Sequence, residues 1–352
     1  MIIKDEPVSV RAGEEINLES LNDYLGKNFP ELGPFKEQKQ FPGGYSNLTY
    51  LLRSEHGEYI LRKPPFGAVI KSAHDMSREF KILSLLHDHY QKIPRPLVLC
   101  ENTEIKGAPF YIMERMVGVI LRPSSLKDMI VVPDEMRKIS ESVVDNLVVL
   151  HSLDINKTGL IALGKPEGYV QRQVEGWTRR YLAAQTDKIE EMEEMSQWLT
   201  HHQPKEVTPT LLHNDYKYDN LVLKENNLSE IIGVLDWEMS TVGDPGMDLG
   251  ASLAYWAEEG DGELARVFNI SWLPGNLTRK EVVQRYIEKS GRTISDPVFY
   301  YVFGLFKNAV IAQQIYARWK QGHSKDPRFG KLIHVIRDLA LRGTRAVENN
   351  SI

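Results

Sequence analysis

The chain has 352 residues, of which 42% are hydrophobic and 26% charged; this is ordinary globular composition with length enough for two lobes. A formal net charge of −5 argues against a protein that coats nucleic acid, and no apolar run reaches the length of a membrane span. A single cysteine excludes an internal disulfide and, with a charged N-terminus that predicts no signal peptide, indicates a cytoplasmic protein.

The first third of the chain predicts a small sheet with one long helix. Residues 17–27 are typical of a short amphipathic helix with Asn17 as its N-cap. Apolar runs between glycine turns predict strands, and a helical apolar period predicts a helix over 73–90. The predicted strands are 37–42, 47–53, 58–63, 97–102 and 109–116.

The remainder of the chain, after Val117-Gly118, predicts mostly helices and one β-hairpin near 210–236. Helices are expected over 134–152 and 168–186 from their apolar faces. A capping box of Thr278 and Glu281 starts another helix, which Gly291 ends, and Asp296-Pro297 opens a long helix to about Lys320. The fold class is therefore α+β, with an N-terminal lobe at 1–117 and a larger C-terminal lobe at 118–352.

A polar turn between two apolar runs, LLHNDYKYDNLVL at 211–223, carries the first candidate site. Asp215 and Asn220 keep the spacing of the protein-kinase catalytic loop, in which the Asp orients a substrate hydroxyl and the Asn binds metal. Asn and Asp are also ordinary turn residues, so a surface hairpin loop is the alternative. We expect His213 to hold this loop in place rather than to transfer protons.

A second acid follows the next apolar run. Asp236 ends the strand-like stretch IIGVLD, 21 residues after Asp215. Phosphoryl transfer needs a carboxylate on Mg²⁺, because the metal neutralises charge on the phosphate oxygens. An acid that merely caps the end of a strand is the alternative.

The predicted N-terminal sheet holds three further candidates. The stretch FPGGYSN at 41–47, which includes Ser46, could close its backbone N–H groups over phosphates, although a plain hairpin would explain its glycines. Arg62, in YILR, takes the place of the phosphate-binding lysine of kinases, and Glu79 on the following helix could pair with it. A surface ion pair is the alternative.

Together these residues resemble the aminoglycoside phosphotransferase family, the small-molecule branch of the protein-kinase-like fold. The nearest likeness is to the kinase domains fused to some acyl-CoA dehydrogenases, and it covers about 41–330. It rests on the stretches GGYSNLTYLL, YILRKPP, SREFKILSLL, FYIMERMVG, LHSLD, PEGYVQRQVEGW, LLHNDYKYDNLVL, VLDWEMSTVGDPGMDLG and FGLFKNAVIAQQIYARW.

The resemblance implies a bilobal protein-kinase-like fold and a role for each candidate. Asp215 would be the catalytic base, with Asn220 and Asp236 as ligands of Mg²⁺. The nucleotide is ATP, with GTP also possible. Its binding residues would be Ser46 in the phosphate loop, Arg62 on the phosphates, Glu79 holding Arg62, and the Glu114 carbonyl and Met116 N–H at the adenine edge.

Two positions depart from the family pattern, and two acids support the site. Asn214 replaces the usual glycine, and Arg62 replaces lysine, whose point charge differs from the planar guanidinium. Asp244, followed by proline, is expected to cap a helix, and Asp248 suits its first turn. In the family this segment supports the catalytic loop.

Only seven residues separate Asp236 from Asp244, which leaves no room for the activation loop of a protein kinase, so a small-molecule hydroxyl is the expected acceptor. Residues 118–352 carry 28 Lys and Arg against 32 Asp and Glu, a net of −4, which is little acidity for binding polycationic aminoglycosides. Arg172, Arg179, Arg180 and Lys307 make an anionic acceptor plausible, such as a hydroxyacyl-CoA or another metabolite, although a solvated helix face would also explain the arginines. A pseudokinase-like binding or scaffolding protein is the alternative function.

Overall fold

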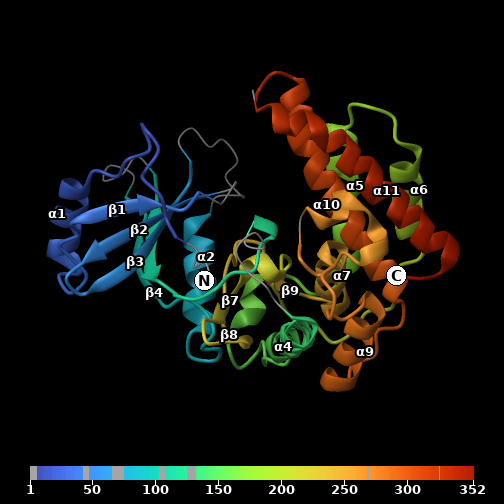
Figure 1. Cartoon of the computed structure of the whole chain (residues 1–352), viewed down its shortest axis with the longest axis horizontal. Helices are drawn as coiled ribbons and strands as arrows, with labels where there is room; N and C mark the ends of the chain where they lie inside the picture. Colours follow the sequence, from blue (N-terminus) through green and yellow to red (C-terminus); the bar gives the residue numbers. More distant parts are fainter. Residues whose placement is uncertain are drawn as a thin grey trace. The chain divides into compact units, whose positions relative to one another are not determined.

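The computed structural model describes residues 6–42, 47–65, 75–102, 108–124, 132–267, 269–324 and 326–352. The chain forms two compact units, which we call the N-terminal unit (Met1–Ile120 and Leu221–Glu238) and the C-terminal unit (Leu121–Asn220 and Met239–Ile352). Each is described by itself (Figure 1). The lobes at 1–117 and 118–352 stay a prediction. Among the described residues, no helix is long and apolar enough to cross a membrane.

The N-terminal unit is built on an antiparallel five-stranded sheet of order β1-β2-β3-β5-β4. Successive side chains along each strand point to opposite faces of this sheet. Tyr50 and Leu52 of β2 belong to one buried cluster with Leu21 and Leu25 of α1, whereas Arg62 of β3 points to the other side and pairs with Glu79 of α2. The elements are α1 Leu18–Asn28, β1 Glu37–Gln40, β2 Leu48–Ser54, β3 Gly57–Lys63, α2 Met76–Leu86, β4 Pro96–Cys100 and β5 Phe110–Glu114.

The N-terminal unit also contains the hairpin of β7 (Leu221–Lys224) and β8 (Asn227–Val234). Val119 and Leu223 exchange two backbone hydrogen bonds of 2.8 Å, so the segment after β5 extends this hairpin. Gly118 has to be glycine there, because a Cβ would lie 2.4 Å from the Leu223 carbonyl oxygen.

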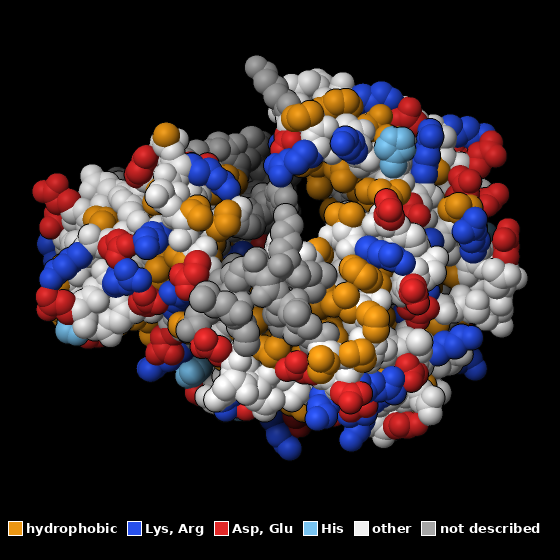
Figure 2. Space-filling model, in the orientation of Figure 1, with side chains coloured by type: hydrophobic (Ala, Val, Ile, Leu, Met, Phe, Trp, Pro, Cys, Tyr) orange, Lys and Arg blue, Asp and Glu red, His pale blue; other side chains and the backbone are white. Residues whose placement is uncertain are grey.

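The C-terminal unit is mostly helical. Its long helix α10 (Pro297–Lys320) packs along α11 (Leu332–Asn349), α7 (Pro245–Tyr255) and α5 (Tyr169–Ala184) (Figure 1). Hydrophobic side chains gather on the face seen in Figure 2, over the area where Figure 1 draws α10 and α7. The other elements are α4 Pro133–His151, α6 Glu190–His201, α8 Glu263–Arg266 and α9 Arg279–Ser290, the strands β6 Thr210–Leu212 and β9 Thr241–Gly243, and short 3₁₀ turns.

The structure confirms the α+β class and most of the predicted elements, and it corrects the bounds of one helix. The helix expected over 73–90 is described only from Met76 to Leu86. The hairpin expected near 210–236 is confirmed, and it is formed by β7 and β8. Strand β6 pairs with β9, and β7 pairs with β8, so the two strands that flank the polar turn do not pair with each other.

Candidate active site

The polar turn at 213–220 is held in the C-terminal unit by two buried tyrosines. The Tyr216 hydroxyl donates to the Val143 carbonyl of α4 at 2.9 Å, and the Tyr218 hydroxyl donates to Asn276 at 2.7 Å. Because these side chains alternate along the turn, Asp215 and Lys217 point the other way and are each 18% exposed. The surface-hairpin alternative is therefore wrong.

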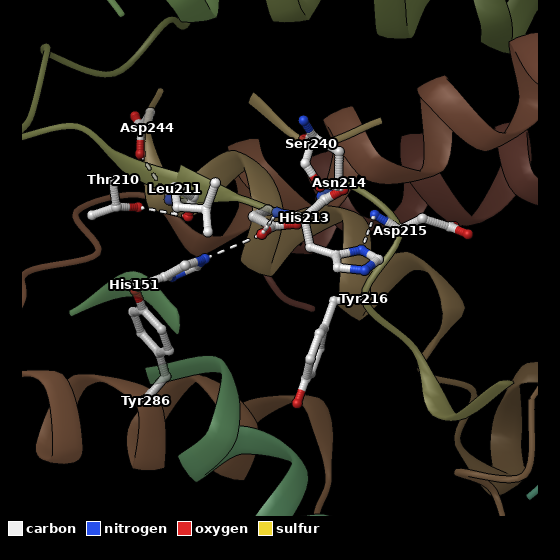
Figure 3. A network of polar contacts seen from close by, with 12 residues as sticks. His151, Thr210, Leu211, His213, Asn214, Asp215, Tyr216, Ser240, Asp244 and Tyr286 are labelled. Atoms are coloured by element: carbon white, nitrogen blue, oxygen red, sulfur yellow. Dashed lines mark hydrogen bonds and ion pairs between the residues drawn. The ribbon is translucent and has the colours of Figure 1, made fainter. Parts of the chain in front are cut away.

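Asp248, near the N-terminus of α7, binds the first two residues of this loop. Its carboxylate accepts the backbone N–H groups of His213 at 2.6 Å and of Asn214 at 2.7 Å. His151 also contacts this carboxylate. Its ring Nε2 lies 3.1 Å from Asp248, and its Nδ1 lies 2.7 Å from the Tyr286 hydroxyl (Figure 3). Asp248 therefore supports the turn, as the sequence predicts, and the helix N-terminus favours its charge.

The pKa of Asp248 reflects these contacts. Burial alone would raise it, but hydrogen bonding and charge from His151, together with His213, outweigh burial and hold the pKa below its ordinary value. Asp244 behaves in the opposite way. It is the N-cap of α7, as predicted, and burial raises its pKa although the Tyr300 hydroxyl donates to it.

Asn214 adopts a left-handed conformation, with φ of 64°. Glycine and asparagine tolerate this region better than other residues, which explains how Asn214 can replace the glycine usual in the family. Its side-chain amide donates to the Met239 carbonyl at 3.1 Å and so fixes the turn from a second side.

Asp215 points away from the His213 ring (Figure 3). The ring Nδ1 of His213 accepts the Asp215 backbone N–H at 3.2 Å, and the ring is almost fully buried, so His213 shapes the loop. The carboxylate of Asp215 lies 2.9 Å from the Asn220 amide nitrogen and 2.9 Å from Lys217 Nζ. Asp215 and Asn220 are thus brought together within one loop.

Lys217 is a site residue to which the sequence assigned no role. Its Nζ lies on the Asp215 carboxylate and 4.5 Å above the ring of Tyr255. Burial would lower the pKa of Lys217, but Tyr255 and Asp215 outweigh it and raise the pKa, so the side chain stays charged. Its position two residues after Asp215, in the same short loop, was the only hint in the sequence that the two side chains could meet.

Arg62 and Glu79 form a buried ion pair within the N-terminal unit, which excludes the alternative of a surface pair. Arg62 Nη2 also lies 3.3 Å from the Asp236 carboxylate and 3.7 Å from Glu238. Burial raises the pKa of Glu79, and the charge of Arg62 offsets part of this rise. The guanidinium therefore lies between the helix acid and the acid that follows β8.

Asp236 also adopts a left-handed conformation, with φ of 67°. The neighbouring Trp237 holds it, since the Trp237 backbone N–H donates to Glu79 at 3.3 Å and its indole donates to the Val234 carbonyl at 2.9 Å. Aspartate is one of the few non-glycine residues that adopt this conformation, and the bonds of Trp237 keep the segment in place.

Two of the remaining predicted nucleotide residues, Glu114 and Met116, lie at the end of β5 and just after it. Glu114 is the last residue of β5, and its backbone N–H donates to the Arg95 carbonyl at 3.0 Å; the contact of its own carbonyl with adenine stays a prediction. Met116 follows and packs its sulfur against Gly233, where a Cβ would lie 2.6 Å away. Ser46 lies outside the described residues.

The side chains at the two candidate ligand positions suit Mg²⁺, which prefers hard oxygen ligands. Asp236 offers a carboxylate. The described hydrogen bonds of the Asn220 amide use its nitrogen, so its Oδ1 faces no described donor. Over the described part of the chain, no cluster of three or more His, Cys, Asp and Glu side chains could hold a metal by itself. Because Asn220 and Asp236 belong to different units, their joint binding of one ion stays a prediction.

A loop of this geometry in one unit and a buried arginine–glutamate pair in the other suggest comparison with phosphotransferases. The model of the phosphotransferase enzyme family matches residues 37–282. The chain belongs to the phosphotransferase enzyme family. This membership makes it an enzyme of the small-molecule kinase type with a kinase-like fold, as the sequence predicts.

Three similar proteins narrow the place of the chain within the phosphotransferase enzyme family. Acyl-CoA dehydrogenase family member 10 of Mus musculus is 36% identical over 88% of this chain and 29% of its own length. Member 11 of Rattus norvegicus is 33% identical over 97% of this chain and 45% of its own length. A solved structure from Ralstonia eutropha with a provisional aminoglycoside phosphotransferase name is 29% identical, with a TM-score of 0.81 over 95% of this chain and 99% of its own.

The chain spans less than half the length of these two acyl-CoA dehydrogenase family members. The predicted likeness to kinase domains joined to such dehydrogenases is confirmed.

Asp248→Asn should lower the free energy of unfolding by about 2–4 kcal/mol at pH 7, because one backbone N–H of the loop would then face an amide NH₂. The folded pKa of Asp248 is depressed, so its contribution is complete above about pH 4 and is lost as the pH falls through the folded pKa. Urea unfolding at pH 7 and near pH 3 measures both effects.

Asp244→Asn is the matched control. Its folded pKa is raised, so the same change at pH 7 should cost less than at Asp248. Equal losses for the two variants, or a loss at Asp248 that does not shrink at low pH, would contradict this account.

Proposed function

We propose that the chain transfers the terminal phosphate of ATP, or of GTP, to a hydroxyl group of a small molecule. The observation that carries this proposal is the arrangement of Asp215. Its carboxylate is half-buried, contacts Lys217 and Asn220, and lies on a loop whose backbone is bonded to a buried acid. A carboxylate held in this way can orient a hydroxyl and accept its proton.

In the proposed reaction Asp215 would act as the base, and Asn220 and Asp236 would hold Mg²⁺. When bound, the ion neutralises charge on the phosphate oxygens. Lys217 Nζ lies 2.9 Å from the Asp215 carboxylate and limits its rotation. The proton of the acceptor hydroxyl moves to a carboxylate oxygen of Asp215.

The nucleotide is assigned to the lobe at 1–117. Arg62 would contact its phosphates while Glu79 fixes the guanidinium, and the buried pair supports this role. The Glu114 carbonyl and the Met116 N–H would meet the adenine edge, and Ser46 would lie in the loop over the phosphates. The lobe at 118–352 would supply the catalytic loop and bind the acceptor, for which we favour a metabolite such as a hydroxyacyl-CoA over an aminoglycoside.

Thermal unfolding with ATP or GTP, each with Mg²⁺ or with EDTA, tests the nucleotide part of the proposal. A ligand that binds only the folded state at a hundredfold excess over Kd adds about 2.7 kcal/mol of stability. We expect a rise in Tm with nucleotide that requires Mg²⁺. No rise with either nucleotide would contradict the proposal, and a rise without any phosphoryl transfer would support the pseudokinase-like alternative.

A further inference from the structure

A pocket of about 410 Å³ opens beside the catalytic loop, entirely within the C-terminal unit. Asn214, the residue before Asp215, lines it, as do residues of α5 and α10. Its volume is in the usual range of small-molecule sites, about 300–1,000 Å³. Its place next to Asp215 makes it the candidate binding site for the phosphate acceptor.

The charged side chains around this pocket are all basic. Lys165, Arg172, Arg180 and Lys307 line it, and no Asp or Glu belongs to its described lining. The C-terminal unit as a whole is not basic, since residues 118–352 carry a net charge of −4. The positive charge is therefore concentrated at the pocket, which attracts anions and repels cations.

Lys307 lies deepest of the four cations. It interrupts the apolar run of α10, is 5% exposed and donates its Nζ to the Asn214 carbonyl at 2.5 Å. Burial lowers the pKa of Lys307, while the charges of Asp215 and Asp248 offset part of that fall. No carboxylate forms an ion pair with Lys307 among the residues that the structure describes, so an anion in the pocket would compensate a costly buried charge.

The three other cations lie near the mouth of the pocket. Arg172 donates to the backbone carbonyls of Lys165 and Glu167 and so fixes the segment that carries Lys165. The Arg180 guanidinium lies 4.6 Å above the ring of Trp177. In contrast, Arg179 on the same helix is 73% exposed, is 3.8 Å from Glu175, and is not part of the lining.

Aromatic side chains cover part of the same wall. Trp177 and Phe303 are buried residues of α5 and α10, and both line the pocket. Apolar wall with a few converging charges suits a ligand that has a hydrocarbon part and an anionic group. A polycationic sugar would find no acidic partner in the described lining.

We propose that this pocket binds a phosphate acceptor that is an anion, with its carboxylate or phosphate at Lys165, Arg180 and Lys307 and its hydrocarbon part on Trp177 and Phe303. That the bound anion accepts the phosphate rests on the proposed function, whereas the binding of an anion in the pocket does not. A compact hydroxy acid and the phosphates of a hydroxyacyl-CoA would supply the same anionic chemistry.

Three probes with one hydrocarbon chain separate the two sources of charge: 3-hydroxyoctanoate, its neutral methyl ester and 3-hydroxyoctanoyl-CoA. Their binding to the whole chain is measured by calorimetry without nucleotide and at two salt concentrations. We expect at least one anion to bind about tenfold or more tightly than the ester, and more weakly at high salt. Tight binding of the free acid identifies a carboxylate, and tight binding of the thioester alone identifies the phosphates.

The double variant Lys165→Glu/Arg180→Glu changes two exposed residues and should weaken binding of the preferred anion by about tenfold or more. Arg179→Glu is the matched control and should change it by less than about twofold. An unchanged Tm of each variant without ligand shows that the fold is retained.

Equal binding of the ester and both anions, no saturable binding of either anion at millimolar concentration, or equal effects of the double variant and Arg179→Glu would overturn the inference. Phosphoryl transfer to neutral alcohols with such a result would leave the proposed function intact. Anion binding without transfer to any hydroxyl would instead contradict the proposed function and keep the pocket assignment.

Discussion

Asp215→Asn should lower turnover by about 10²- to 10⁴-fold while nucleotide affinity changes by less than about tenfold. The amide keeps the size of the side chain, so the loop held by Asp248 should keep its shape. It loses the ability to take the proton of the hydroxyl. Because phosphoryl-transfer transition states are loose, much of the effect should come from poorer orientation of the acceptor.

Steady-state turnover and nucleotide titration on the same protein measure the two expected changes. Asp219→Asn is a matched control, since it makes the same change four residues later in the loop, and it should stay within about threefold of the parent chain. Near-normal turnover of Asp215→Asn with weakened nucleotide binding would reverse the roles assigned to Asp215 and Asp236.

Asp236→Asn should remove most of the Mg²⁺-dependent part of nucleotide binding, because an amide is a much poorer ligand for Mg²⁺ than a carboxylate. Asparagine is the informative replacement, since it tolerates the φ of 67° at this position. Alanine would add about 1–2 kcal/mol of backbone strain and confuse loss of the ligand with loss of stability.

The thermal shift with ATP or GTP is compared with and without Mg²⁺ for the parent chain and for Asp236→Asn. The stability of the variant without nucleotide should stay within about 1 kcal/mol of the parent. An unchanged Mg²⁺-dependent shift in a folded variant would show that Asp236 is not a ligand of the ion.

The starts of several helices could be predicted because capping is local. Asn17, Asp244, Thr278 and Asp296 each accept a backbone N–H of the turn that they begin, as the sequence indicates. Helix α6, which was not predicted, has Ile189 at its N-cap and no side-chain cap, and α11 has Lys331 there, also without one. Helix α11 does repeat apolar residues at helical spacing on its buried face, so its periodicity was an available signal although no side-chain cap marks its start. These buried residues are Ile336, Leu339, Ala340, Gly343 and Ala346.

In the candidate site, too, contacts between residues close in the sequence could be predicted, and contacts between distant residues could not. Asp215 and Asn220 lie in one short loop, so their spacing alone predicts their meeting. The bonds from Asp248 to the start of that loop join residues 34 and 35 positions apart, and the bond from Lys307 to Asn214 spans 93. Such contacts depend on how α7 and α10 pack, which one sequence does not specify.

The pairing of strands was the other point beyond the reach of the sequence. The sequence predicted one hairpin near 210–236, which β7 and β8 form, but not the pairing of β6 with β9. A strand can satisfy its backbone N–H and C=O groups with either neighbour, so the apolar runs alone do not choose the partner. In the structure the buried side chains of Tyr216 and Tyr218 fix the turn that joins β6 to β7.

The most direct test of the central claim is mass spectrometry of candidate acceptors after incubation with the chain, Mg²⁺ and ATP or GTP. The set includes hydroxy acids, hydroxyacyl-CoA thioesters, neutral alcohols and kanamycin, with the Asp215→Asn variant as the control for each. We expect an acceptor heavier by one phosphate group, formed with the parent chain and strongly reduced with Asp215→Asn, and little or no product from kanamycin. Efficient phosphorylation of kanamycin would contradict the assigned acceptor class, and the absence of any phosphorylated acceptor despite Mg²⁺-dependent nucleotide binding would contradict the claim that the chain is a kinase of small molecules.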